Sequence, residues 1–442
     1  MSDLAAKRAP GFLKNSVIYQ ISLRAFTLDG TLRAAERLLP HIASLGVDIV
    51  YLCPFVLADD DPREEFWSDR QRKSGLGNPK NMYRVKDYYA VDPEYGTEDD
   101  LKSFVRTAHA NNLRVLPDLV YYHCGPAAAF IGGHPDFVVR DGNGAVKNGR
   151  WHFPELNFNS SALREYLWKN MEYFVREFDV DGYRCDVSNA VPLDFWEEGR
   201  RRIDALKPGL VMLAESFGGV PGEQRAAFDM QYCGLHHVVN GVLAGEKPAS
   251  ELRRELEAQA AAGLAGARFL RSTDNHDVAN DQYDGRLEKR NPAGAEAALA
   301  LCFMLDGIPF LYNGQEIADA RRHSIFGNRF YGKNLVVDWS NAVTPAGKHR
   351  MEFVRKMIEL RRRIPALTEG RVVWIDNPHP DSLLMFRRES EGETITVTVN
   401  FGAEPHTVPA AGKTVLASGG NAVLDEGGTA ELPAYGYLVF RA

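Results

Sequence analysis

The chain has 442 residues, of which 45% are apolar and 25% charged, and its formal net charge is −7. This composition is ordinary for a globular protein, and the length exceeds what one core usually holds, so we expect two or three domains. No basic block is present, which argues against nucleic acid as a partner. The first 15 residues contain no apolar segment of signal-peptide length, and the longest run of small apolar residues, Ala297–Leu305, is too short to span a bilayer. We therefore expect a cytoplasmic protein with no membrane partner.

Strand-like and helix-like segments alternate from the N-terminus onward. Val17–Phe26 and Val47–Phe55 predict the first two strands, and apolar residues recur at helical spacing between them, from Leu32 to Ile42. The sequence Thr97–Asp100 resembles a capping box and predicts the start of a helix. That helix leads into a third strand at Arg114–Val120.

A stretch with glycine, histidine and proline, Cys124–Asn157, then interrupts the pattern, and an amphipathic helix follows from Leu163 to Phe178. Five further segments predict the remaining strands: Gly182–Val187, Leu210–Ser216, Phe228–Tyr232, Arg268–Thr273 and Ile308–Tyr312. Eight alternating strands and helices predict an α/β fold with a closed (β/α)8 barrel, in which residues 124–157 form a short insertion after the third strand.

The pattern changes after Ile364-Pro365, where short apolar runs are separated by turns. Thr394–Val399 alternates strictly and places Ile395, Val397 and Val399 on one face of a strand. We expect residues 1–366 to form the barrel and residues 367–442 to form a small antiparallel β-sandwich domain.

The five cysteines are scattered and include no CxxC pair, so the sequence favours reduced core thiols and gives no support to a zinc site. They are Cys53, Cys124, Cys185, Cys233 and Cys302.

Three carboxylates, Asp186, Glu215 and Asp277, each come at the end of a predicted strand. Because the carboxyl ends of parallel strands meet at one face of a barrel, this pattern favours acid/base or nucleophilic chemistry there. Arg184 lies two residues before Asp186 on the same face of its strand, where it would keep the carboxylate ionised. A structural interpretation also fits each residue: a buried ion pair for Asp186, an N-cap or salt bridge for Glu215, and a turn for Asp277.

In this order the segments resemble the motifs of the α-amylase superfamily, glycoside hydrolase family 13. The motifs that carry the resemblance are Asp118–His123, Gly182–Asp186, Ala214–Phe217 and Asp274–Asp277, with supporting matches at Gly46–Pro54, Asp87–Thr97, Pro154–Asn157 and Gly307–Glu316. The resemblance covers nearly the whole chain.

The resemblance implies a retaining double displacement at three catalytic residues. Asp186 would attack the anomeric carbon, and Glu215 would protonate the leaving oxygen and later activate water. Asp277 would bind sugar hydroxyls most tightly in the transition state. Two carboxyl groups about 5–5.5 Å apart suit this chemistry.

Five substrate-site residues follow from the same resemblance. His123 and His276 would donate hydrogen bonds to hydroxyls of the cleaved sugar, and Tyr83 would stack on that sugar. Arg184 would hold Asp186, and Asp118 would hold Arg184. A lone histidine such as His123 is more often structural, and for Tyr83 a buried loop aromatic stays as the alternative interpretation.

The sequence departs from the family at the usual calcium ligands. Tyr122 stands where the family has an asparagine, and Asn189-Ala190 replaces a Lys-His pair. We therefore expect no metal or other cofactor. Trp151 and Phe153 of the insertion would either shape the pocket or anchor its loop. The C-terminal aromatics would pack against the barrel.

The sequence favours a hydrolase of α-glucans or maltooligosaccharides, and two alternatives stay open. A transglycosidase or disaccharide isomerase, of the glucanotransferase or trehalose-synthase type, would use the same carboxylates. A non-catalytic sugar-binding or assembly protein would fit the fold but would not need them. Linkage preference, exo or endo action and oligomeric state are also open.

Overall fold

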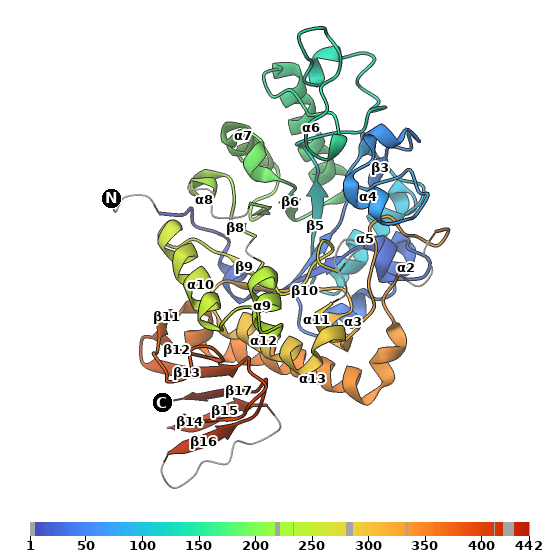
Figure 1. Ribbon diagram of the computed structural model, residues 1–442. Coiled ribbons are helices and arrows are strands. Elements are labelled where there is room, and N and C mark those ends of the chain that lie inside the picture. Colours follow the sequence, from blue (N-terminus) through green and yellow to red (C-terminus); the bar gives the residue numbers. More distant parts are fainter. Residues whose placement is uncertain are drawn as a thin grey trace.

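The computed structural model describes residues 5–216, 222–232, 234–279, 286–331, 335–410, 412–418 and 428–441. Phe217 of the third motif and Cys233 lie outside these ranges, and the other four cysteines are buried free thiols. Eight parallel strands form the central sheet, in the order β8-β7-β6-β5-β2-β1-β10-β9 (Figure 1). They are β1 (Ile18–Ile21), β2 (Ile49–Leu52), β5 (Arg114–Leu119), β6 (Gly182–Cys185), β7 (Val211–Ala214), β8 (Met230–Gln231), β9 (Leu270–Arg271) and β10 (Ile308–Tyr312).

The sheet closes on itself between β8 and β9. Parallel bridges join Gln231 to Phe269 and Gly234 to Ser272, and the Leu235 amide donates to the Ser272 carbonyl at 2.8 Å. The predicted eight-stranded barrel is therefore confirmed, and the carboxyl ends of its strands share one face.

Helices surround the barrel and cover its outer face (Figure 1). The helices are α1 (Leu23–Phe26), α2 (Leu32–Glu36), α3 (Leu39–Ser44), α4 (Asp69–Lys73), α5 (Glu98–Ala110), α6 (Ser161–Phe178), α7 (Leu193–Leu206), α8 (Glu223–Ala226), α9 (His236–Leu243), α10 (Ser250–Ala262), α11 (Leu287–Arg290), α12 (Pro292–Met304), α13 (Pro345–Arg363) and α14 (Pro365–Glu369). The capping box predicted at Thr97 is present at the start of α5, with Asp100 as its second partner.

Two predicted elements differ from the structure for local reasons. The first strand ends at Ile21, because the Ser22 amide donates to the Asn313 side chain at 3.0 Å and the chain then turns into α1. The helical pattern from Leu32 to Ile42 is divided into α2 and α3, with Pro40 in the first turn of α3. Proline in the interior of one longer helix would remove a backbone hydrogen bond and clash with the preceding turn.

Two segments rise from the carboxyl face and frame the mouth of the barrel. A hairpin of β3 (Val56–Ala58) and β4 (Val85–Val91), which the sequence pattern missed, lies between β2 and α5. Residues 124–157 form irregular structure held by isolated antiparallel bridges, such as Val138 with Leu156.

The C-terminal part is a layered antiparallel β-structure. A five-stranded sheet in the order β11-β12-β13-β17-β15 faces a two-stranded sheet of β14 and β16, with an apolar cluster between them. Its strands are β11 (Arg371–Trp374), β12 (Leu383–Ser390), β13 (Glu393–Asn400), β14 (His406–Pro409), β15 (Lys413–Ala417), β16 (Thr429–Leu432) and β17 (Tyr437–Arg441). The predicted boundary at residue 366/367 falls inside α14, and the division into domains stays a prediction.

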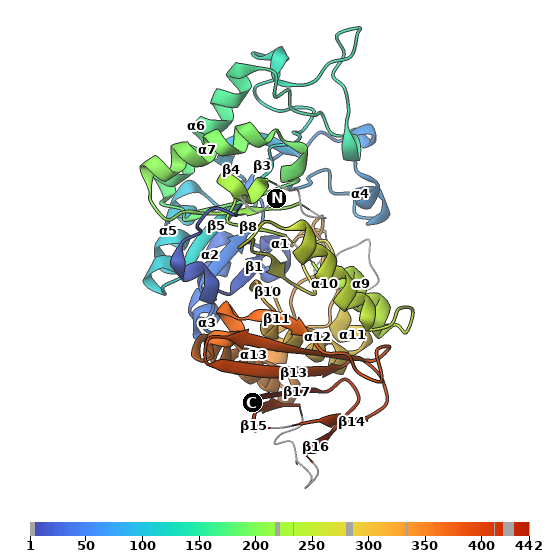
Figure 2. The same ribbon diagram turned by 90° about the vertical axis from the view of Figure 1, so that its left-hand side faces the viewer.

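The five-stranded sheet packs against the barrel through its other face. Ile395, Val397 and Val399, predicted to share a face, are fully buried and belong to the same core as the barrel. Figures 1 and 2 show α12 and α13 between the barrel and this sheet. Tyr437 is buried here and donates to Glu296 at 2.9 Å, as expected for an aromatic that packs against the barrel.

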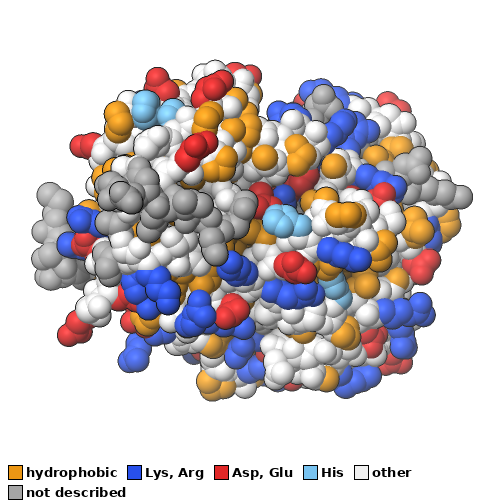
Figure 3. Space-filling model, turned by 90° about the horizontal axis from the view of Figure 1, so that it is seen from below, with side chains coloured by type: hydrophobic (Ala, Val, Ile, Leu, Met, Phe, Trp, Pro, Cys, Tyr) orange, Lys and Arg blue, Asp and Glu red, His pale blue; other side chains and the backbone are white. Residues whose placement is uncertain are grey.

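Charged side chains of both signs occur on the face seen from below (Figure 3). Among the described helices, none is long and apolar enough to cross a membrane.

Candidate active site

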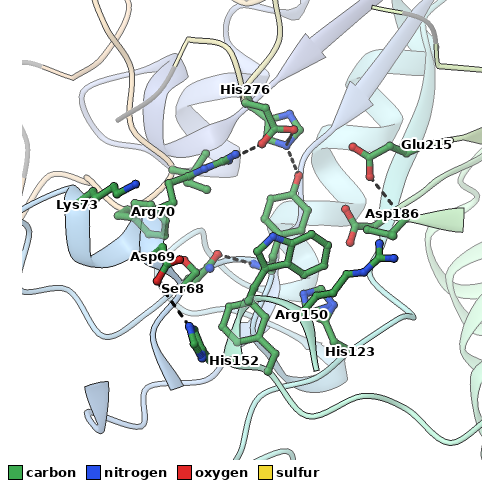
Figure 4. A pocket seen from close by; sticks show the side chains of 18 of the residues that line it. Ser68, Asp69, Arg70, Lys73, His123, Arg150, His152, Asp186, Glu215 and His276 are labelled. Atoms are coloured by element: carbon green, nitrogen blue, oxygen red, sulfur yellow. Dashed lines mark hydrogen bonds and ion pairs between the residues drawn. The ribbon is translucent and has the colours of Figure 1, made fainter. Parts of the chain in front are cut away.

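A cavity of about 530 Å³ opens at the carboxyl ends of the barrel strands. Six of the eight predicted site residues line it: Tyr83, His123, Asp186, Glu215, His276 and Asp277. The other two, Asp118 and Arg184, are buried and bonded to residues that line it. The structure therefore brings all eight together, and Figure 4 shows most of the cavity's side chains. A pocket of this size with converging polar groups is typical of a small-molecule site.

Arg184 joins the carboxylates of three neighbouring strands. Its Nη1 donates to Asp186 at 2.8 Å and to both oxygens of Asp118 at 2.8 Å, and its Nη2 lies 2.6 Å from Glu215 Oε1. Asp118 also accepts from the Tyr51 hydroxyl at 2.6 Å. A planar guanidinium holds several carboxylates in fixed directions, so this network orients Asp186 and Glu215 toward each other.

The backbone around Asp186 is set by close packing between β6 and β7. Gly182 begins β6 with φ +137°, and a Cβ there would lie 1.8 Å from the Val211 carbonyl oxygen, so only glycine fits. Val187, directly after Asp186, is left-handed at φ 44° and ψ 43°, an unusual conformation for a β-branched residue. Its amide donates to Glu215 Oε2 at 2.9 Å. Such strain is characteristic of functional sites, and sequence reasoning missed Val187 because no residue pattern signals it.

The three carboxyl groups of the pocket differ in the direction in which their pKa values are shifted. Burial raises the pKa of Asp186 well above its usual range, Glu215 adds to the rise, and Arg184 opposes it without outweighing burial. The prediction that Arg184 keeps this carboxylate ionised is therefore wrong. Burial also raises the pKa of Glu215, against the effect of Arg184. Two acids that oppose each other's ionisation lose their protons in separate steps, so this pair passes through a state with one proton. A nucleophile beside a general acid needs that state.

Asp277 behaves differently from the other two acids. Burial acts to raise its pKa, but His276 and Arg70 outweigh burial and hold the pKa well below its usual range. Arg70 Nη1 donates to Asp277 Oδ1 at 2.5 Å. Asp277 is therefore held ionised, as a group that stabilises positive charge must be. Sequence reasoning missed Arg70, which lies on the short helix α4 and carries no motif.

His276 is fixed by contacts on both ring nitrogens. Gln20 Nε2 lies 2.6 Å from His276 Nδ1, and the Tyr83 hydroxyl lies 2.6 Å from Nε2. Because the Gln20 amide nitrogen can only donate, Nδ1 accepts and Nε2 carries the proton. Tyr83 also stacks on His276 with ring centroids 5.5 Å apart. Gln20 was missed, although a glutamine inside the apolar segment Val17–Ile21 is a signal that could have revealed it.

His123 lies on the opposite wall, against the insertion. Its ring stacks on the buried Phe153 at 5.0 Å and lies 5.4 Å from Trp151. Burial lowers the pKa of His123 to about 3, so its ring is neutral. Trp151 is 43% exposed and left-handed at φ 59°. Both aromatics therefore line the pocket, and Phe153 also anchors the loop.

Several known proteins are similar to this chain in sequence and in fold. The family described as "Alpha amylase, catalytic domain" matches residues 14–136. The α-amylase MalA of Haloarcula japonica is 28% identical over 430 residues, 92% of this chain, and the chain spans 59% of that protein's length. The maltogenic α-amylase of Bacillus acidopullulyticus is 26% identical over 504 residues, covering 98% of this chain and 78% of that protein. In sequence this chain is therefore similar to α-amylases and related enzymes that hydrolyse α-glucans.

Solved structures of α-amylases have the same fold. The α-amylase of Lactobacillus plantarum superposes with a TM-score of 0.80 at 23% identity, over 97% of this chain and 99% of that one. This likeness supports the barrel and the C-terminal β-domain together.

The residues at the α-amylase family's usual calcium position do not suit that ion. The Tyr122 hydroxyl, in place of the family's asparagine, donates to Glu155. A neutral phenol is not among the oxygen ligands that calcium prefers. Within the described ranges, no group of three or more His, Cys, Asp or Glu side chains is placed to hold a metal. The absence of a cofactor stays a prediction.

Proposed function

We propose that this protein is a retaining α-glucosidic hydrolase that cleaves α-glucans or maltooligosaccharides by double displacement. The observation that carries the proposal is the shared contact of Asp186 and Glu215 with one guanidinium, beside the ionised Asp277 in a single pocket. Relatives named as an α-amylase, a maltogenic α-amylase and a cyclomaltodextrinase support this substrate class.

In the first step a carboxylate oxygen of Asp186 attacks the anomeric carbon while the bond to the leaving glycosidic oxygen breaks. The proton of Glu215 passes to that oxygen, so the leaving sugar departs neutral and Asp186 carries a glycosyl ester. The raised pKa of Glu215 suits a group that holds its proton until this moment.

In the second step the ionised Glu215 takes a proton from water, and the water oxygen displaces Asp186 from the anomeric carbon. Two inversions restore the original configuration at that carbon. Asp277 stabilises the positive charge that develops on the sugar ring in both steps.

The remaining residues bind and orient the sugar. His123 is a neutral donor, His276 carries a proton on Nε2, and Tyr83 offers a ring face and a hydroxyl to the same sugar. Arg184 donates to Asp186 and is itself held by Asp118, so these two residues position Asp186 although they do not line the cavity.

Product analysis over time on maltose, maltoheptaose, pullulan, sucrose and trehalose tests the proposal. We expect shorter α-glucans to form from maltoheptaose, with α-anomers as the first products by NMR. Longer products would indicate a transglycosidase, and interconversion of maltose and trehalose would indicate an isomerase. Binding of maltoheptaose with no turnover would overturn the proposal in favour of a sugar-binding protein.

A further inference from the structure

One wall of the pocket is formed by α4, within the long connection between β3 and β4. Ser68, Asp69, Arg70 and Lys73 of this segment all line the cavity. Arg70 reaches furthest, to Asp277 Oδ1. Lys73, three residues on, is exposed and has no carboxylate partner among the described residues. The wall thus presents cationic hydrogen-bond donors to whatever sugar lies beside Asp277.

The wall is held firmly in place from behind. The buried Gln71 donates to the carbonyls of Asn78 at 2.9 Å and Pro79 at 3.2 Å. Asn78 in turn donates to the Phe326 carbonyl at 2.7 Å, which ties the segment to the loop that follows β10. The buried Arg84 donates to the Asp61 carbonyl at 2.6 Å. A segment joined to its surroundings by these hydrogen bonds is a fixed boundary of the pocket rather than a loose flap.

The wall lies across the pocket from the proposed general acid. In Figure 4, Glu215 and Asp186 lie on one side, and Arg70, Asp69 and Lys73 lie on the other. In a retaining mechanism the acid protonates the leaving oxygen, so the leaving part of the chain lies on the Glu215 side. The α4 side is therefore where the non-reducing part of the chain would extend.

We propose that Arg70 and Lys73 close the pocket on the non-reducing side, so that the enzyme removes single sugars from the ends of α-glucan chains. The inference deepens the proposed function and rests on it. Arg70 contacts Asp277, the carboxylate that would grip the cleaved sugar, so its guanidinium lies where a second sugar on this side would have to pass. The terminal hydroxyls of the chain would accept hydrogen bonds from Lys73 and Arg70.

A matched pair of substrates tests the closed wall. Linear maltoheptaose and the cyclic glucan of seven units have the same sugars and linkages, but the cyclic compound has no chain end. We expect the linear compound to be cleaved at least about 100-fold faster in kcat/KM. When its reducing end carries a fluorescent label, the first labelled product should be the chain shortened by one unit.

The outcomes separate the inference from the proposed function. Comparable turnover of both compounds, or a mixture of early labelled products, would overturn the inference alone. No turnover of either compound would overturn the proposed function and the inference with it. Both results come from the unaltered protein and do not depend on a variant that folds.

A variant pair then assigns the selectivity to Arg70. Arg70→Ala should lower overall activity but reduce the linear-to-cyclic preference to about 10-fold or less, because the wall opens. Arg72→Ala on the same helix is the control: Arg72 is exposed, bonds Asp69 and the Glu64 carbonyl, and does not line the cavity. The linear-to-cyclic preference of Arg72→Ala should equal that of the unaltered protein. An unchanged preference in a folded Arg70→Ala protein would contradict the assignment.

Discussion

The carboxyl groups of Asp186 and Glu215 are bridged by one buried guanidinium, that of Arg184. The bridge fixes the direction of both acids, while burial raises both pKa values; Glu215 adds to the rise at Asp186, and Asp277 adds to the rise at Glu215. The pair can therefore hold a single proton, as the proposed division between a nucleophile and a general acid requires.

Replacement of Asp186 by Asn should lower kcat by at least about 10⁴-fold, because the amide cannot form the glycosyl ester. Asp194→Asn, which breaks an exposed ion pair with Arg164, is the matched control and should change activity by less than about twofold. Steady-state kinetics on maltoheptaose with melting curves for both variants provide the test. Substantial turnover by Asp186→Asn would show that another group is the nucleophile.

Glu215→Gln should affect substrates according to their leaving groups. A glucoside with an acidic phenol needs no proton to depart, so its glycosylation step should slow by less than about 10-fold. A maltooligosaccharide should slow by at least about 10³-fold. Pre-steady-state release of the phenol separates glycosylation from the later water step. Equal losses on both substrates would argue against Glu215 as the acid.

Loss of Arg70 should move the acidic limb of the pH profile of kcat/KM to higher pH. Arg70 lowers the pKa of Asp277, so Arg70→Ala should raise that pKa. Activity that needs ionised Asp277 would then be lost at a higher pH as the pH falls, and the acidic limb of kcat/KM should shift upward. Arg72→Ala should leave the limb in place. If the acidic limb of kcat/KM stayed at the same pH in Arg70→Ala, the ionisation of Asp277 would not determine that limb.

A chelator should leave the melting temperature unchanged, because the Tyr122 hydroxyl bonds Glu155 where the family binds calcium. Differential scanning fluorimetry with EDTA, and then with added calcium, checks this expectation. A drop in Tm that calcium restores would reveal a structural ion.

The junction between the barrel and the C-terminal sheet can be tested through Ile395. This side chain is fully buried in the core shared by both parts, so Ile395→Ala should lower the free energy of unfolding by about 2–5 kcal/mol. Thr407→Ala, exposed on β14, should cost less than about 0.5 kcal/mol. Urea unfolding followed by fluorescence measures both. A cost for Ile395→Ala as small as that for Thr407→Ala would show that the two parts do not share a core.

The sequence carried enough information to predict the barrel, and with the family resemblance it named eight residues that the structure brings to one pocket. Strand periodicity located β10 to the residue, and the ends of the strands at Asp186, Glu215 and Asp277 brought those carboxylates to one face. The β3–β4 hairpin was missed because its bulged register breaks the alternation that marks a strand.

Other features depend on contacts between distant segments and leave no local pattern. Arg70 meets Asp277 across 207 positions of the chain, and Gln20 meets His276 across 256. A local motif cannot reveal a contact between residues so far apart in the sequence. The strained backbone of Val187 follows from close packing of neighbouring strands, which residue spacing alone does not encode.

A trapped intermediate tests most directly whether Asp186 forms the covalent bond to sugar. A 5-fluoroglucosyl fluoride, whose ester intermediate hydrolyses slowly, should add one sugar mass to the protein, and peptide mapping should place that mass on Asp186. A sugar attached to a different residue, or inactivation without attachment, would show that Asp186 is not the nucleophile.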